Sequence, residues 1–438
     1  MEAPCMSTLP ASAAPTAAPP ADEQPALNFQ RPAGISRQRA TEFVIENLLR
    51  LAGFGSILIT VGIVFVLLYE TIPFFAWQHH TPHLAEAVAG RTTVTRLLVS
   101  PGDTVEQGAP MVEAAVVEDG VSKPTRLTAT MFTRIDAIKV KPGDAITRDT
   151  ELLAVSQRVR FSDFFGDKLW APVFDVPRFG IWSLIVATLV TTAVALLIAI
   201  PAGTVSAIWL SEYCKPQIRE WIKPALELLA AVPTVVYGYF ALLIVTPILQ
   251  RIAPFVILPL VNAVKWCFNV VISLWNGNLI VYTTDLPGFN MLSAGLVMGI
   301  MIIPYVASLS EDAMRSVPMQ LREGAYATGA TRFQTATRVL FPAALSGITA
   351  AYILAISRAV GETMIVAIAA GLQSRFTFDP TESAASISAA IVQAVMGDLP
   401  HDSVAYRAVF AAGLVLLMIT LFFNIAGYML RKRYREAY

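Results

Sequence analysis

Long apolar runs separated by short polar segments dominate this chain of 438 residues. A helix needs about 20 consecutive apolar residues to cross the roughly 30 Å hydrocarbon core of a bilayer. Runs of that length occur at 51–74, 181–210, 226–249, 291–310, 346–370 and 407–430. The pattern predicts an all-α polytopic membrane protein with six transmembrane helices.

Basic residues are unevenly distributed among the segments that separate these runs. Arg and Lys precede the first run, lie between the second and third and between the fourth and fifth, and form RKRYR after the sixth. Because Lys and Arg are enriched in cytoplasmic loops, a six-span arrangement with both termini in the cytoplasm places all of these segments on the expected side.

A further apolar segment between residues 250 and 290 complicates the span count. Prolines, asparagines and Lys265 interrupt PFVILPLVNAVKWCFNVVISLW. One extra crossing would move the basic segment 312–344 and the C-terminus outside, against the charge rule. We therefore expect an interfacial helical hairpin on the outer side, with a re-entrant pair as the alternative.

Composition divides the chain into four parts. Residues near the N-terminus are rich in Ala and Pro and cannot bury a core, so we assign 1–45 to a disordered cytoplasmic tail. The first transmembrane helix is expected at 46–75 and a β-rich extracytoplasmic insertion at 76–160. The remaining five helices fall within 161–438.

The expected insertion contains an internal repeat. LLVSPGDTVEQGAPMV (97–112) aligns with IKVKPGDAITRDTELL (138–153), 41 residues later. Pro-Gly-Asp after an alternating strand is typical of a type II turn, because Pro restricts φ and Gly supplies a positive φ. The two halves resemble the barrel-sandwich hybrid of biotinyl and lipoyl domains. The tip VEAAVVEDG lacks their modifiable lysine, so no swinging-arm cofactor is expected.

Composition also limits the chemistry. The chain is 55% hydrophobic and 15% charged, with a formal net charge of +0, which argues against a nucleic-acid partner. Its three cysteines are scattered without metal or redox spacing, and HHTPH (79–83) lacks supporting Asp or Cys ligands, so no metal site is expected.

No catalytic constellation is evident, and the phosphate-binding sequence G-x-x-x-x-G-K-[ST] is missing from the chain. We therefore expect no enzyme activity and no cofactor. Energy for any active process must come from a separate subunit.

A polar segment between the fourth and fifth runs carries the most specific motif. EGAYATGATRFQTATRVLFP resembles the EAA loop of ATP-binding-cassette importer permeases, in which Glu-Ala-Ala, Gly and a final Pro recur at fixed spacing. The matching positions are Glu323, Ala325, Gly329 and Pro342, and Gly324 replaces an alanine. The pattern predicts a short helix, a tight turn at Gly329, and a second helix ending where Pro342 starts the next span. Such an elbow can dock into an ATPase.

Three further runs narrow the resemblance. RAVGET (358–363), ELLAAVPTVVYG (227–238) and FFGDKLWAP (164–172) resemble the phosphate-specific importer permeases of the PstC type. The similarity extends over about 160–430 and leaves out the tail and the insertion. It implies a multi-pass permease subunit of an ATP-driven importer of inorganic phosphate in the bacterial inner membrane.

The same resemblance implies partners besides membrane lipid. They are a second permease subunit of the same fold in a heterodimer, two ATP-binding-cassette ATPase subunits, and an extracytoplasmic phosphate-binding protein.

Two charges interrupt the fifth apolar run. At the centre of a bilayer each costs roughly 2.5–3.5 kcal/mol on insertion scales. Arg358 and Glu362 are four residues apart, so on one helix they share a face and can form an ion pair. One interpretation is a structural pair. The other, which the resemblance supports, is a guanidinium that meets an oxyanion, with Glu362 holding it in place. We assign Arg358, Glu362 and Thr363 to the substrate pathway.

Two alternative functions stay open at this stage. Another oxyanion, such as sulfate, molybdate or phosphonate, would suit Arg358 as well as phosphate does. A non-transporting envelope scaffold or sensor could use the β insertion to bind a partner.

Overall fold

The computed structural model describes residues 35–80, 92–118, 121–147, 150–174, 176–255, 258–259, 262–263, 285–397, 399–400 and 403–433. Residues 63–438 form one compact unit, and the residues before them form another. Three expected features lie wholly or largely outside the described residues: the tail before residue 35, the outer hairpin, and the tip of the insertion at 119–120.

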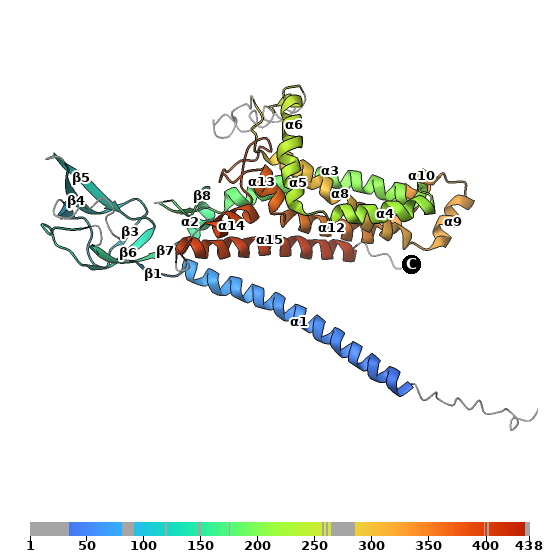
Figure 1. Ribbon diagram of the computed structural model, residues 1–438, viewed down its shortest axis with the longest axis horizontal. Helices are drawn as coiled ribbons and strands as arrows, with labels where there is room; N and C mark the ends of the chain where they lie inside the picture. The colour runs from blue at the N-terminus through green and yellow to red at the C-terminus, as the bar shows by residue number, and fades with distance from the viewer. Residues whose placement is uncertain are drawn as a thin grey trace, which may run out of the picture. The chain divides into compact units, whose positions relative to one another are not determined.

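Helices account for most of the described chain (Figure 1). In chain order they are α1 Ile35–Phe75, α2 Phe161–Gly166, α3 Trp182–Ile208, η2 Trp209–Tyr213, α4 Pro216–Ala230, α5 Thr234–Phe240, η3 Ala241–Val245, α6 Thr246–Ile252, α8 Met291–Arg315, α9 Met319–Ala327, α10 Arg332–Thr335, η4 Ala336–Leu340, α11 Phe341–Ala343, α12 Leu345–Val360, α13 Met364–Ala369, α14 Ile387–Met396 and α15 Val404–Arg433. The elements η2, η3 and η4 are π-helical turns.

Helix α1 begins at Ile35, earlier than the expected start at residue 46. The segment ISRQRATEFVIENLL contains good helix formers and neither Gly nor Pro, so nothing in it opposes an earlier start. The predicted boundary between tail and helix, at residues 45–46, therefore lies inside α1.

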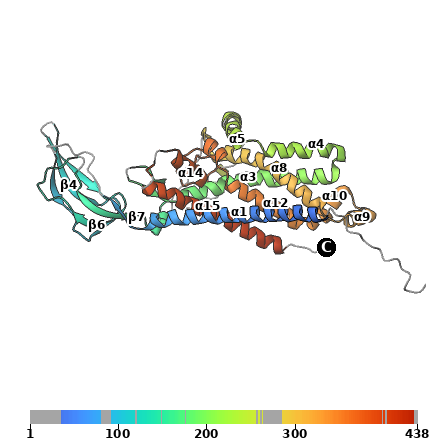
Figure 2. The same cartoon turned by 60° about the horizontal axis from the view of Figure 1, so that its bottom comes forward.

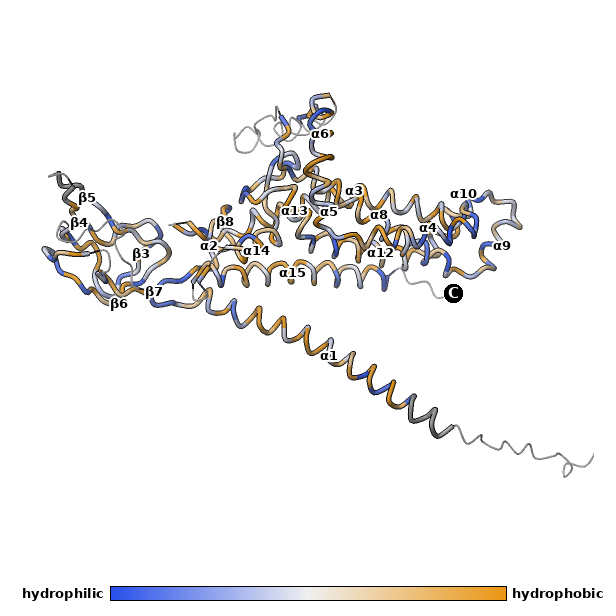
Figure 3. The backbone as a smooth tube through the Cα atoms, viewed as in Figure 1, coloured by the Kyte–Doolittle hydropathy of each residue, from blue (hydrophilic) through white to orange (hydrophobic). Residues whose placement is uncertain are grey.

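Five described helices are long and apolar enough to cross a bilayer. They cover Glu42–Phe75, Trp182–Tyr213, Thr234–Ile252, Met291–Arg315 and Val404–Arg433. A sixth crossing is reached if Arg332–Ala343 and Leu345–Val360, which meet at 75°, count as one broken span. Apolar residues dominate α1 and α15 along their lengths, whereas polar residues gather around α9 and α10 (Figure 3).

The third apolar run does not form the helix expected at 226–249. Helix α4 ends at Ala230, and α5 starts at Thr234 after Pro233, which has no N–H to continue the helical ladder. The apolar span is Thr234–Ile252 instead. Helix α4 before it is amphipathic and none of its residues is buried.

Helices α3 and α8 pack closely along their lengths, and α12 lies beside α8 and α15 (Figure 2). Glycines permit this approach: a Cβ on Gly295 would lie 2.7 Å from Val194 Cγ1, and one on Gly299 would lie 2.8 Å from the Ala195 carbonyl oxygen. Small residues let membrane helices approach with dense van der Waals packing. The α3–α8 pair is therefore the rigid centre of the bundle.

The expected insertion is built of strands. They are β1 Gln78–His80, β2 Thr92–Leu97, β3 Thr104–Val105, β4 Pro110–Glu118, β5 Val121–Thr128, β6 Phe132–Ile138 and β7 Leu153–Arg158, and a short pair β8 Trp170–Ala171 and β9 Arg178–Phe179 follows. One sheet has the order β1-β7-β6-β3 and a second the order β2-β4-β5. Both contribute apolar side chains to one core, including Val94, Met111, Ile135 and Leu153.

Both Pro-Gly-Asp segments form the predicted turns. Gly102 and Gly143 have φ of +93° and +94°, and each following Asp N–H donates to the carbonyl three residues back at 3.1 Å. Each turn then bonds to the opposite half of the repeat: Gly102 N–H donates to Ile135 at 2.8 Å and Gly143 N–H donates to Val94 at 2.8 Å. The two halves exchange equivalent contacts, which gives the domain an internal two-fold pattern.

Candidate functional site

The predicted elbow between α8 and α12 starts with helix α9. Its end forms a Schellman motif: Gly329 N–H donates to Tyr326 at 2.9 Å, and Ala330 N–H donates to Ala325 at 3.1 Å. Gly329 has φ of +82°, in the left-handed region that favours glycine. The tight turn predicted at this position is therefore confirmed.

A capping box starts the second limb of the elbow. Thr331 Oγ1 accepts from Gln334 N–H at 3.3 Å, and Gln334 Oε1 accepts from Thr331 N–H at 2.9 Å. Helices α10, η4 and α11 then run continuously through Pro342 to Ala343, and the chain bends by 75° into α12. A proline ring clashes with the carbonyl four residues earlier, which the wider π-helical turn before Pro342 accommodates.

Side chains on α9 divide into an exposed group and a bound group. Glu323 and Gly324 are exposed, and Ala325 is half-buried. Within the described parts of the chain, Glu323 makes no hydrogen bond or ion pair, so its carboxylate is available to a partner. Arg322 and Tyr326, by contrast, bind Glu212 at distances of 3.1 Å and 3.0 Å.

The two charges expected to share one helix face do not. Helix α12 ends at Val360, and α13 starts only at Met364, so Glu362 lies in the break between them. Glu362 Oε1 accepts from the backbone N–H of Met364 at 3.2 Å and of Ile365 at 3.4 Å. Across the described residues no carboxylate lies within ion-pair distance of Arg358, and the predicted Arg358–Glu362 pair is wrong.

One contact from α14 and one contact within residues 361–363 stabilise the break between α12 and α13. Ser388 Oγ on α14 donates to the Glu362 carbonyl at 2.7 Å, and the Glu362 side chain is buried. Thr363 is half-buried and its Oγ1 donates to the Gly361 carbonyl at 3.3 Å. A helix that stops inside a span leaves backbone groups that need such partners.

Arg358 occupies the last turn of α12 and is exposed. Its Nη2 donates to the Ala230 carbonyl at the end of α4 at 3.5 Å, and its Cζ lies 5.8 Å from the centre of the Tyr305 ring. A guanidinium carries five N–H donors in a planar fork, so most of them lack a partner among the described residues. Counting from Leu345 at about 1.5 Å per residue, Arg358 lies about 20 Å along the helix from the elbow.

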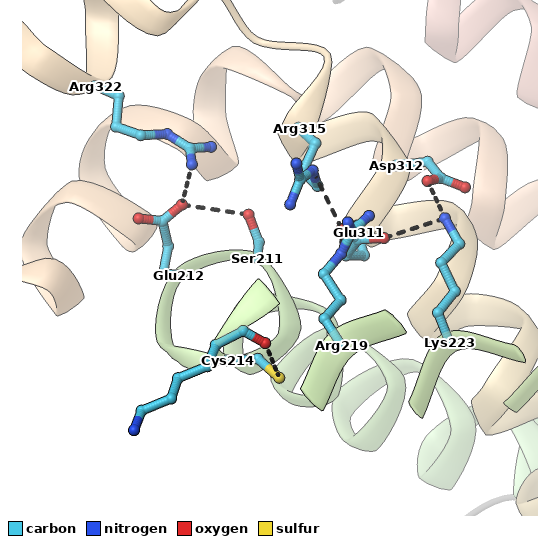
Figure 4. A network of polar contacts seen from close by, with 10 residues as sticks. Ser211, Glu212, Cys214, Arg219, Lys223, Glu311, Asp312, Arg315 and Arg322 are labelled. Carbon is cyan, nitrogen blue, oxygen red and sulfur yellow. Dashed lines mark hydrogen bonds and ion pairs between the residues drawn. The ribbon is translucent and has the colours of Figure 1, made fainter. Parts of the chain in front are cut away.

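Figure 4 shows two buried carboxylates that the sequence interpretation missed. Glu311 on α8 accepts from Arg219 and Lys223 of α4 at 2.7 Å and 3.3 Å, and Arg315 lies 3.7 Å away. Glu212 on η2 holds α9, as described above. Apart from Arg315, which is four residues from Glu311, their partners are about 90 or more residues away in sequence, so no local spacing identifies those contacts.

The contacts around Glu311 and Glu212 shift the pKa values of Lys223 and Tyr326. Burial alone would lower the pKa of Lys223, but hydrogen bonds and charges from Asp312 and Glu311 outweigh it and raise that pKa above its ordinary value. Burial, together with the hydrogen bond to Glu212, raises the pKa of the Tyr326 phenol. Lys223 is therefore charged and Tyr326 protonated at neutral pH.

Named relatives match about three fifths of the chain. The phosphate transport system permease protein PstC of Mesorhizobium japonicum is 33% identical over 273 residues, which cover 61% of this chain and 78% of the relative. PstC of Pasteurella multocida is 33% identical over 257 residues, covering 57% and 73%. A solved MetNI methionine ABC transporter matches 59% of this chain and 95% of its own at 15% identity, with a TM-score of 0.39.

The family model described as "binding-protein-dependent transport system inner membrane component" matches residues 199–436, more than half of the chain. The matched region starts within α3 and contains both the elbow and the broken span of α12 and α13. The chain therefore belongs to the family of binding-protein-dependent transport system inner membrane components.

Proposed function

We propose that this chain is a transmembrane permease subunit of an ATP-driven importer of inorganic phosphate. Family membership makes it a transporter component, and the relatives that share a third of its aligned residues are named phosphate transport permeases. In this proposal the exposed face of the elbow, with Glu323 and Gly324, binds an ATPase. In this proposal two ATP-binding-cassette subunits act from the cytoplasm, a second permease of the same fold completes the pathway, and a phosphate-binding protein delivers substrate outside.

The observation that supports an anionic substrate is the guanidinium of Arg358. It lies at the middle of the apolar run 346–370, is exposed in this chain, and has no carboxylate partner among the described residues. An unpaired charge at such depth costs roughly 2.5–3.5 kcal/mol unless water or a ligand solvates it. A second permease subunit facing Arg358 would leave a polar pathway in which its donors meet a tetrahedral oxyanion. We infer that Glu362 and Thr363 shape the break beside that pathway.

The membrane arrangement follows from the same proposal. In this proposal the fifth of six crossings is the apolar run 346–370, which contains α12 and α13, rather than the bent pair Arg332–Ala343 and Leu345–Val360. Both termini and the basic elbow are then on the cytoplasmic side. The β domain, which we take as 76–160, then lies outside between α1 and the permease domain 161–438. Its likeness to a barrel-sandwich hybrid rests on the exchanged contacts of the two half-repeats.

Coupling through the elbow can be tested with two glycines on the same loop. A Cβ on either Gly324 or Gly329 meets nothing within 4 Å, but Gly329 has φ of +82° whereas Gly324 is helical. Gly329→Ala should strain the turn by about 1–2 kcal/mol and lower phosphate uptake relative to ATP hydrolysis. Gly324→Ala is the matched control and should leave both rates unchanged. Equal uptake in the two variants would contradict the coupling role.

The transported anion can be identified in cells lacking this chain. Labelled phosphate uptake is measured with and without the wild-type chain, in the presence of excess sulfate or molybdate. Restored uptake that those anions do not suppress supports the phosphate assignment. Suppression by one of them would reassign the substrate, and no restoration at all would refute the proposal.

A further inference from the structure

The carboxylate of Glu212 joins the elbow to helix α3. Its Oε1 lies 3.1 Å from Arg322 Nη1, and its Oε2 accepts from the Tyr326 hydroxyl at 3.0 Å. Arg322 and Tyr326 are four residues apart, so both project from one face of α9. Figure 4 shows Arg322 reaching across to Glu212 at the end of η2. Both oxygens of one carboxylate are thus engaged by the same helix.

The ion pair in this contact is shielded from solvent, since the Glu212 side chain is 2% exposed and that of Arg322 is 16% exposed. Tyr326, at 41%, is exposed. Ion pairs of this kind are less screened by salt than surface pairs, and charge-assisted hydrogen bonds hold a narrow geometry. All three residues help to line an open pocket of about 560 Å³, together with Ser211, Cys214, Lys215 and Arg332. The clamp, defined as Glu212 with Arg322 and Tyr326, therefore combines a shielded ion pair with an exposed hydrogen bond in the wall of this pocket.

Covalent geometry alone would leave α9 free to swing. It joins α8 through three residues, Ser316 to Pro318, and joins the second limb through the Gly329 turn. Both connections can act as hinges, because a few loop residues suffice to absorb a change of backbone angles. Leu321 of α9 also packs against the apolar cluster of Ala207, Met314 and Leu340. The clamp adds to that packing a directional polar attachment, which fixes the orientation of α9 relative to η2 and α3.

Helix α3, to which the clamp attaches α9, is itself closely packed against α8. It packs against α8 through the close glycine contacts at Gly295 and Gly299, and a Cβ on Gly203 would lie 2.7 Å from Val306. Packed helices with such contacts move as one body rather than deforming independently. A push on α9 would therefore be delivered to the α3–α8 pair, in addition to the path through Pro342 into α12.

We propose that Glu212 is a positioning residue that locks α9 to α3, so that displacement of the elbow moves the α3–α8 pair instead of bending the hinges. The inference rests on the proposed function, in which an ATPase displaces the elbow. Without the clamp, ATP hydrolysis continues while the movement is lost between α9 and the bundle.

The test uses the assembled transporter with its ATPase and binding protein. Glu212→Gln removes the charge and keeps the side-chain size, and it should lower phosphate moved per ATP hydrolysed by at least about tenfold. Tyr326→Phe removes one of the two contacts without changing charge and should give a smaller loss. Arg315→Gln is the control, because Arg315 pairs with buried Glu311 on its own helix, and no ion pair or hydrogen bond joins it to the described residues of α9.

A second readout is independent of the substrate. Amide hydrogen exchange of residues 319–327 should be faster in Glu212→Gln than in Arg315→Gln, because the clamp no longer holds α9. If the wild type moves no phosphate, the proposed function fails while exchange still tests the clamp. A wild-type transport ratio in Glu212→Gln, unchanged exchange, or an equal loss in Arg315→Gln would overturn the inference.

Discussion

Replacement of Glu311 by Gln is expected to loosen helix α4 from helix α8. The Glu311 side chain is 1% exposed, and its carboxylate oxygens form ion pairs with Arg219 Nη2 at 2.7 Å and Lys223 Nζ at 3.3 Å. Gln keeps the volume and one acceptor but removes the charge that compensates Arg219, Lys223 and the more distant Arg315. The contact matters because none of the residues of α4 is buried, so polar attachments replace an apolar core there.

The destabilisation caused by Glu311→Gln can be worked out from the exposed fractions of the partner side chains. Removing one partner of a fully buried ion pair costs about 3–5 kcal/mol. Arg219 and Lys223 are 21% and 23% exposed and can turn toward water, and Lys223 keeps its bond to Asp312. A loss of about 2–3 kcal/mol, below most of that range, is therefore expected. The unfolding entropy is about 2.1 cal/mol/K per residue, so for 438 residues each kcal/mol corresponds to about 1 °C and the Tm should fall by roughly 2–3 °C.

Thermal unfolding of the purified chain in detergent, followed by far-UV circular dichroism, measures the change. Asp312→Asn is the matched control, since Asp312 is the neighbouring carboxylate, binds the same Lys223, and is 52% exposed. An exposed pair contributes about 0–1 kcal/mol, so this variant should shift Tm little. Equal shifts in Glu311→Gln and Asp312→Asn would refute the reasoning from burial.

Two further changes test packing and ionisation. Gly295→Ala should lower Tm, because its Cβ would lie 2.7 Å from Val194 Cγ1, whereas Gly324→Ala should not; similar Tm values would contradict the close packing. The hydrogen bond from Ser156 is the main cause that holds the pKa of Asp136 below its ordinary value of 3.8. The ionised Asp136 carboxylate therefore stabilises the folded state above pH 3.8, and this stabilisation is lost as the pH falls through the lowered pKa. Asp136→Asn should therefore destabilise the β domain at neutral pH and match the wild type in strong acid; a pH-independent difference measured by unfolding would rule this out.

Features set by neighbouring residues could be predicted from the sequence. The elbow depends on Gly329 in the left-handed region and on a capping box within Thr331–Gln334, both of which are local. The Pro-Gly-Asp turns are local in the same sense. What the repeat did not reveal is that each turn bonds to the strand of the opposite half, because strand pairing over long separations depends on the whole fold.

The site was predicted less completely, for two physical reasons. Arg358 and Glu362 have helical spacing, but the helix stops between them where Ser388 binds the Glu362 carbonyl, a contact from another helix. Tertiary contacts of this kind override helical propensity. The clamp at Glu212 and the contacts of Glu311 with Arg219 and Lys223 likewise join segments about 90 or more residues apart. Charges in apolar spans indicated that polar partners must exist, and only the fold identifies them.

The importer account depends most directly on Arg358. Uptake of labelled phosphate is compared between the wild type, Arg358→Gln and Arg358→Lys in cells lacking this chain, with membrane insertion of each variant verified. Arg375→Gln serves as the control, since Arg375 is 59% exposed and pairs with Glu382 at 3.6 Å. The account predicts at least about a tenfold loss for Arg358→Gln, a smaller loss for Arg358→Lys, and none for Arg375→Gln. Wild-type uptake by an inserted Arg358→Gln chain would contradict the claim that this guanidinium meets the anion.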